Sequence, residues 1–165
     1  MDIKTKTARR VENVSKTINA SGTTVSVIPF RATGSIYFPK LYGIVTTALG
    51  ANHTTAFFRL NDQTAQTAIT LATGSTLSAF VAGSWLGKTD KATVAVTVKN
   101  ANIGQFFESG ITNEMIFQPF VVVQKNGANT DIEYRYSTTD APTSGVIQFF
   151  CEWEPLSAGS LVVGL

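Results

Sequence analysis

The chain offers few side chains that could act as catalysts or metal ligands. It contains one histidine, His53, and one cysteine, Cys151. A zinc site made of histidine and cysteine ligands needs three or four such residues. A serine or cysteine nucleophile needs a neighbouring base, which would have to be His53, and no nucleophile-elbow motif occurs. We therefore expect neither a zinc site nor a catalytic triad, and we place His53 in a solvated turn.

Pairs of acidic residues are the next candidates for chemistry. Glu152 and Glu154 share one face of a predicted strand, and paired carboxylates can hydrolyse glycosides. The same pair, or Asp131 with Glu133, could bind calcium at a subunit contact, but the dense acidic loop of a dedicated calcium site is missing. Carboxylates with this spacing are more often a solvated edge or a salt-bridge site between subunits. We predict no catalytic residue, no metal site and no cofactor.

Aromatic side chains could form a platform for a sugar ring. The candidates are Trp85, Tyr134, Tyr136 and Trp153. All but Trp85 fall on the core-facing side of predicted strands, so core packing accounts for them. A carbohydrate-binding or receptor-binding module, with Trp85 and its loop as the contact, remains an alternative function.

The elements that must position these residues are short strands. From residue 23 onward, apolar or alternating runs are separated by glycine, asparagine, proline and serine, as in an antiparallel sandwich. We predict strands over residues 23–30, 34–38, 42–48, 55–61, 68–71, 92–99, 115–124, 131–137 and 146–154. The fold class is therefore all-β, an antiparallel, jelly-roll-like β-sandwich.

Alternation assigns one face of three of these strands to the core. The core-facing residues are Val94, Val96 and Val98, then Ile132, Tyr134 and Tyr136, and finally Ile147, Phe149, Cys151 and Trp153. Cys151 is thus predicted to be a small buried residue rather than a nucleophile.

Two loop regions receive specific predictions. Asn126-Gly127 favours a type I′ turn, which needs positive φ at both central residues, and therefore predicts a hairpin over residues 115–136. Residues 70–91 carry apolar side chains at helical spacing, but three glycines interrupt them. We expect a loop with one short helix there.

The two ends differ in composition from the body, which we assign to residues 23–155. Residues 1–22 carry five basic and two acidic side chains and form a predicted extended arm, with a short helix through Val11, Val14 and Ile18 as the alternative. Residues 156–165 form an apolar tail that would promote aggregation unless it docks on the domain or on a neighbour. Subunits of symmetric shells and rings frequently have two terminal segments that extend onto neighbouring subunits.

Composition favours assembly with other protein. Charged residues make up 15% of the chain, where about 25% is usual, and hydroxyl and amide side chains replace them. Such a surface costs less to desolvate than a charged one. No apolar run is long enough for a membrane span, and residues 1–19 lack a secretion signal, so we expect synthesis in a cytoplasm-like space.

Two stretches resemble small virion proteins of bacteriophages. They are Tyr42-Gly-Ile-Val-Thr-Thr-Ala-Leu-Gly-Ala-Asn52 and the ending Trp153-Glu-Pro-Leu-Ser-Ala-Gly-Ser-Leu-Val-Val163. The resemblance covers about a fifth of the chain. It implies a non-enzymatic β-sandwich present in many copies on a virion, as a capsid decoration or cement protein. A single jelly-roll subunit of the shell is the alternative, followed by a tail or fibre component.

The implied partners are other copies of the chain, as a trimer or larger, and other capsid proteins, in a virion assembled in the host cytoplasm. Nucleic acid is a further candidate partner for the basic arm, although five cations without interleaved aromatic residues are a poor signature for it. The candidate subunit contacts are Arg9, Arg10, Lys16, Leu161, Val162 and Val163. Removing residues 1–22 or 156–165 is expected to leave the sandwich folded and to weaken association.

Overall fold

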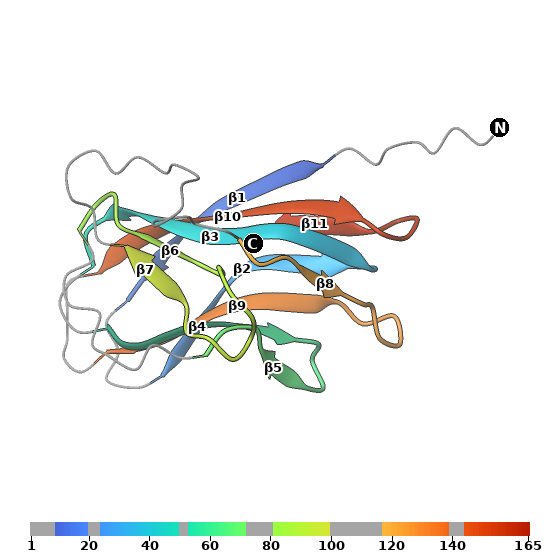
Figure 1. Cartoon of the computed structure of the whole chain (residues 1–165), viewed down its shortest axis with the longest axis horizontal. Helices are drawn as coiled ribbons and strands as arrows, with labels where there is room; N and C mark the ends of the chain where they lie inside the picture. The colour runs from blue at the N-terminus through green and yellow to red at the C-terminus, as the bar shows by residue number, and fades with distance from the viewer. Residues whose placement is uncertain (1–8, 20–23, 50–52, 72–80, 100–116, 139–143) are drawn as a thin grey trace.

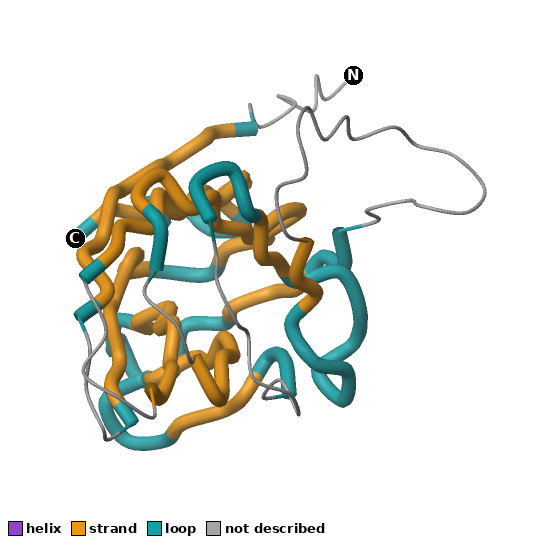
Figure 2. Tube along the Cα trace, turned by 90° about the vertical axis from the view of Figure 1, so that its left-hand side faces the viewer, coloured by secondary structure: helices purple, strands orange, loops and turns teal. Residues whose placement is uncertain are grey.

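The computed structural model describes residues 9–19, 24–49, 53–71, 81–99, 117–138 and 144–165. Within these ranges the backbone forms strands and loops and no helix (Figures 1 and 2). The strands are β1 (Arg10–Ile18), β2 (Val25–Thr33), β3 (Ile36–Thr47), β4 (His53–Asn61), β5 (Gln66–Ala68), β6 (Trp85–Gly87), β7 (Thr97–Lys99), β8 (Phe120–Val122), β9 (Thr130–Thr138), β10 (Gly145–Pro155) and β11 (Leu161–Gly164).

The described strands form two antiparallel sheets (Figure 1). The six-stranded sheet has the order β1-β10-β3-β6-β7, with β8 also paired to β3. The five-stranded sheet has the order β11-β2-β9-β4-β5. The first four strands alternate between the sheets, so the ladders join segments far apart in the chain. The prediction of an all-β antiparallel sandwich is confirmed.

The core lies between the two sheets and is built by alternation. Every residue predicted to face the core on β9 and β10 is buried, none with more than 1% of its surface exposed. In the predicted strand 92–99 the structure extends only 97–99 as β7, although Val96 is buried as expected. Period-2 patterning was therefore a reliable guide on the long central strands, where both neighbours are paired.

Strand β3 is continuous where two strands were predicted. The prediction left residues 39–41 between the two strands, and they include Pro39, which cannot donate to a ladder. The register against β10 shifts here, because Lys40 pairs with Glu152 while Tyr37 pairs with Glu154. Phe38 and Pro39 thus form a bulge opposite one residue of β10, and a bulge is a position that tolerates proline.

The turn at Asn126-Gly127 is present, but the hairpin predicted around it is wrong. Both residues have positive φ, +53° and +74°, and the Ala128 amide donates to the Lys125 carbonyl at 3.0 Å. The strands on either side belong to different sheets, however. β8 pairs with β3 and β9 pairs with β2 and β4, so this turn carries the chain from one sheet to the other.

The helix expected within residues 70–91 is absent from the described part, 70–71 and 81–91. Residues Trp85–Gly87 instead form β6, which the sequence did not predict. A Cβ on Gly87 would lie 2.5 Å from the Trp85 ring, so the glycine leaves the space that the indole occupies. The spacing of apolar residues alone could not reveal that the Trp85 ring packs over Gly87.

The buried Cys151 thiol and Tyr134 phenol predict that the protein loses stability at alkaline pH. Burial raises the pKa of Cys151 above its ordinary 9.0 and the pKa of Tyr134 above its ordinary 10.0. The fold therefore favours the protonated forms. Their stabilisation is complete below these ordinary values and is lost progressively at higher pH, by up to about 1.4 kcal/mol per pH unit for each group.

Urea unfolding at several pH values between about 8 and 11 tests this expectation. The variant Cys151→Ala with Tyr134→Phe should lose less stability over that range than the wild type. The Tyr134 hydroxyl is buried without a hydrogen-bond partner among the described residues, so removing it should not destabilise the protein at neutral pH. An unchanged pH slope in the double variant would contradict the prediction.

Candidate assembly surface

The first and last strands of the described chain meet on one side of the sandwich. β1 is the edge strand of the six-stranded sheet, and β11 is the edge strand of the five-stranded sheet. The two strands contact each other, and a Cβ on Gly164 would lie 3.3 Å from the Val14 Cβ. All six predicted subunit contacts thus lie on or beside one pair of strands, which we call the terminal edge (residues 9–18 and 161–165). Their prediction as subunit contacts stays a prediction.

The described parts of the predicted arm and tail are strands of the two sheets. Residues 10–18 pair with β10, so the helix considered for Val11, Val14 and Ile18 is wrong. Residues 161–164 pair with β2, which docks the tail on the domain itself. Residues 1–8 and 20–22 of the arm lie outside the described residues.

The tail presents apolar side chains to solvent. Leu161, Val163 and Leu165 are 45%, 37% and 42% exposed, whereas Val162 points into the core and is 1% exposed. On β1, Val11 is 59% exposed. The terminal edge therefore offers apolar area from both strands, and burying it against protein would be favourable.

The basic residues at the start of β1 contact the last long strand. Arg9 donates to Glu154 at 3.1 Å and lies 3.4 Å from Glu152, and its hydrogen bond to Glu154 raises the pKa of Arg9. Arg10 lies over the Trp153 ring, 4.9 Å from its centroid. Lys16 lies farther along β1, partly exposed. Arg9 and Arg10 thus bind within their own chain.

The first acidic pair takes part in several ion pairs. Lys40 approaches Glu152 at 2.8 Å in addition to Arg9, so Glu152 and Glu154 form a surface ion-pair cluster. No group of three or more histidine, cysteine or acidic residues in the described ranges could hold a metal ion. The side chain of His53 lies outside what the structure describes, and its backbone begins β4.

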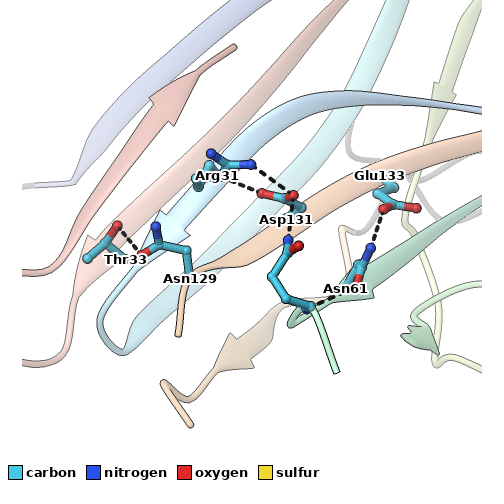
Figure 3. Close-up of polar contacts among 7 residues, drawn as sticks. Arg31, Thr33, Asn61, Asn129, Asp131 and Glu133 are labelled. Atoms are coloured by element: carbon cyan, nitrogen blue, oxygen red, sulfur yellow. Dashed lines mark hydrogen bonds and ion pairs between the residues drawn. The ribbon is translucent and has the colours of Figure 1, made fainter. Parts of the chain in front are cut away.

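The second acidic pair belongs to a buried polar network on the outer side of the five-stranded sheet (Figure 3). Asp131 accepts from Arg31 at 2.6 and 3.1 Å and from Gln63 at 3.0 Å. Glu133 accepts from Asn61 at 2.7 Å and from Arg59. Asp131 and Glu133 are only 2% and 3% exposed, so cations and amides already fill the positions that a calcium ion would need.

The sequence did not reveal this network. The acidic residues of β9 were predicted to face away from the core, which is correct, but their partners come from β2, β4 and the β4–β5 turn. Register places Arg31 opposite Asp131 and Arg59 opposite Glu133. The sequence feature that indicates the network is a pair of opposite charges on neighbouring strands, and it can be recognised only once the strand order is known.

Trp85 is not an exposed sugar contact. It is 3% exposed, and its ring packs against Phe117 at 5.7 Å and Tyr42 at 6.4 Å between centroids. Phe150 stacks on Tyr42 at 5.0 Å, which completes an aromatic cluster on the outer side of the six-stranded sheet. The hypothesis of Trp85 as a glycan platform is therefore wrong.

Comparison with known proteins gives little. No family model and no curated protein matches the chain. Among solved structures, a chain from the structure of infectious bursal disease virus, Gx strain, is similar at 14% identity and a TM-score of 0.28. The match covers 94% of this chain and 38% of that chain, so this chain spans well under half of its length. No helix in the described residues is long and apolar enough to cross a membrane.

Proposed function

We propose that the chain is a non-enzymatic structural protein of a virus particle that assembles in many copies. The observation that carries the proposal is the terminal edge, where β1 and β11 lie together and expose Val11, Leu161, Val163 and Leu165. Docked ends with apolar outer side chains suit a subunit that is covered by its neighbours. The resemblance of two segments to bacteriophage virion proteins supports the choice of a virion.

The strand order supports the same proposal. Strands β1-β10-β3-β6 face strands β2-β9-β4-β5, an order that fits an eight-stranded jelly roll with β7, β8 and β11 added. Jelly rolls occur in viral capsid and lectin domains, although a fold alone does not fix a function. This order favours a subunit of the shell itself, while the sequence resemblance favours a decoration protein.

The remaining partners follow from these two roles. A shell subunit would associate with other copies as a trimer or larger, and a decoration protein would bind capsid proteins of a particle assembled in the host cytoplasm. The carbohydrate-binding alternative loses its proposed contact, because Trp85 is buried. Contact of residues 1–22 with nucleic acid stays a prediction, as does the absence of enzymatic activity.

Truncation is a poor test of this function, contrary to the sequence-based expectation. Deleting residues 1–22 would remove Ile18, which is 2% exposed, and deleting 156–165 would remove Val162, which is 1% exposed. Both deletions would open the core and expose the ladder of a neighbouring strand. Point substitutions of outward side chains keep both strands.

Light scattering coupled to size exclusion should show concentration-dependent self-association of the full chain. Leu161→Asp is expected to weaken it by about tenfold or more, because burying a leucine contributes about 1.5–3 kcal/mol and an aspartate would have to be desolvated. Thr67→Asp is the control, since Thr67 is exposed on β5 at the far edge of the same sheet. Equal masses for wild type and Leu161→Asp would contradict a role for the terminal edge in self-association.

A further inference from the structure

Strand β1 is a long, regular edge. Its nine residues pair with β10 without a register shift, from Arg10 opposite Trp153 to Ile18 opposite Gly145. Among the described residues β10 is its one ladder partner, so the other side of β1 presents unpaired N–H and C=O groups. Edges are normally protected by proline, a bulge or short length. β1 has none of these, whereas the other described edges, β5, β7, β8 and β11, have three or four residues.

Three charges, Arg10, Glu12 and Lys16, lie on one face of this edge, and Arg10 is placed over the Trp153 ring of its own chain. Glu12 and Lys16 share the side of β1 that carries Val14, which packs against the core, and Ile18, which is buried. Neither charge has an ion-pair partner among the residues that the structure describes. A charge at such a position repels most incoming strands, because the strand would cover it. A strand with matching charges would instead pair with both.

We infer that two copies of this chain pair edge to edge through β1, antiparallel, with a two-fold axis at Val14. In this register Glu12 of each copy lies opposite Lys16 of the other, and the symmetry creates this pair twice. The Val14 side chains of the two copies meet at the axis. The inference rests on the proposed function, since it names a contact through which a self-assembling coat protein would grow.

The charges select this register over its neighbours. With a two-fold axis perpendicular to the joined sheets, the core-facing residues of one copy lie opposite the core-facing residues of the other. The alternative registers are therefore those in which the axis passes through a residue other than Val14. Centring on Asn13 places Arg10 opposite Lys16, and centring on Glu12 or Lys16 places that charge opposite its own copy. Centring on Ser15 places both Glu12 and Lys16 opposite apolar residues. Like charges that face each other across strands are destabilising.

The outer face of β1 accepts the same register. Val11 would lie opposite Thr17, and Asn13 opposite Ser15, which are small pairs without charge. The pairing would cover part of Val11, which is 59% exposed. Self-complementary pairs on both faces are what an isologous interface requires.

Charge exchange within the chain tests the pairing. Lys16→Glu and Glu12→Lys should each weaken dimerisation by about tenfold or more in sedimentation velocity, because each places like charges opposite each other twice. The exchanged variant Glu12→Lys/Lys16→Glu restores opposite charges and should return the dissociation constant to within about threefold of wild type. Equal urea midpoints would show that the variants fold alike.

A disulfide across the axis provides an independent measurement. In a Cys151→Ala background, Val14→Cys places two cysteines directly opposite, with Cα atoms about 4.5–5.5 Å apart, which suits a disulfide. Mild oxidation should therefore yield a covalent dimer. Thr17→Cys is the matched control, because its two copies would lie about 20 Å apart along the strands although Thr17 is more exposed.

The outcomes separate this pairing from the proposed function. Charge-reversed variants that associate like the wild type, or equal crosslinking of Val14→Cys and Thr17→Cys, would overturn the β1 pairing. Self-association that persists in those variants and falls in Leu161→Asp would leave the assembly function standing on β11. A chain that is monomeric at every concentration would also overturn the pairing.

Discussion

Replacing Phe149 by alanine is expected to lower the free energy of unfolding by about 3–5 kcal/mol. Phe149 is 0% exposed and packs against Tyr134 and Phe58 of the opposite sheet, at 5.3 and 6.2 Å between ring centroids. Its ring also covers Gly43, whose missing side chain leaves the space it occupies. The substitution would remove the ring that joins both sheets and leave a cavity that these neighbours cannot fill.

The next residue is a matched control. Phe150 has the same side chain on the same strand, but it points outward, is partly exposed and stacks on Tyr42. Phe150→Ala is expected to cost about 1–2 kcal/mol, from lost area and one aromatic pair. Urea unfolding followed by tryptophan fluorescence measures both values. Equal losses for the two variants would mean that the faces of β10 do not divide into core and surface.

This contrast between neighbours is the part of the fold that the sequence predicted best. On β9 and β10, every core-facing position from Ile132 to Tyr136 and from Ile147 to Trp153 holds an apolar side chain or Cys151, because these positions point between the two sheets. The same rule placed Cys151 in the core and denied it a role as nucleophile. Burial of the thiol, with its raised pKa, agrees with that assignment.

The edge strands were harder to predict for a physical reason. On β1 the core-side positions hold Arg10, Glu12 and Lys16 beside Val14 and Ile18, since an edge residue can reach solvent past the sheet. Alternation therefore disappears from the sequence although the strand is regular. β11 is too short to show a period, and β6 has its large residue, Trp85, folded over Gly87.

The candidate site was predicted in its residues but not in its geometry. Basic residues near the start and apolar residues near the end were both expected to form contacts. The two sets lie on strands that contact each other because β1 pairs with β10 and β11 pairs with β2. Both pairings join distant parts of the chain. No local pattern carries that information, so the sequence could not show that they form one surface.

Breaking the Arg59–Glu133 pair is expected to be as damaging as the core substitution. Arg59 is 9% exposed and Glu133 is 3% exposed, and Arg59 also donates to Gln66 and, at 3.4 Å, to Ser26. Arg59→Met would leave Asn61, at 2.7 Å, as the one remaining hydrogen-bond donor to the Glu133 carboxylate among the described residues. An uncompensated buried charge of this kind costs about 3–5 kcal/mol.

The double variant separates the pair from its surroundings. Arg59→Met with Glu133→Leu removes both charges, and apolar replacement of a buried ion pair is often neutral, so most of the loss should be recovered. Arg9→Met is the matched control, since Arg9 pairs with Glu154 at the exposed surface and its loss should leave the unfolding midpoint near that of wild type. If Arg59→Met behaves like Arg9→Met, solvent reaches Glu133 and the network does not hold β4 against β9. A large coupling would instead show that charge matching across these strands fixes their register, as we infer for β1 between copies.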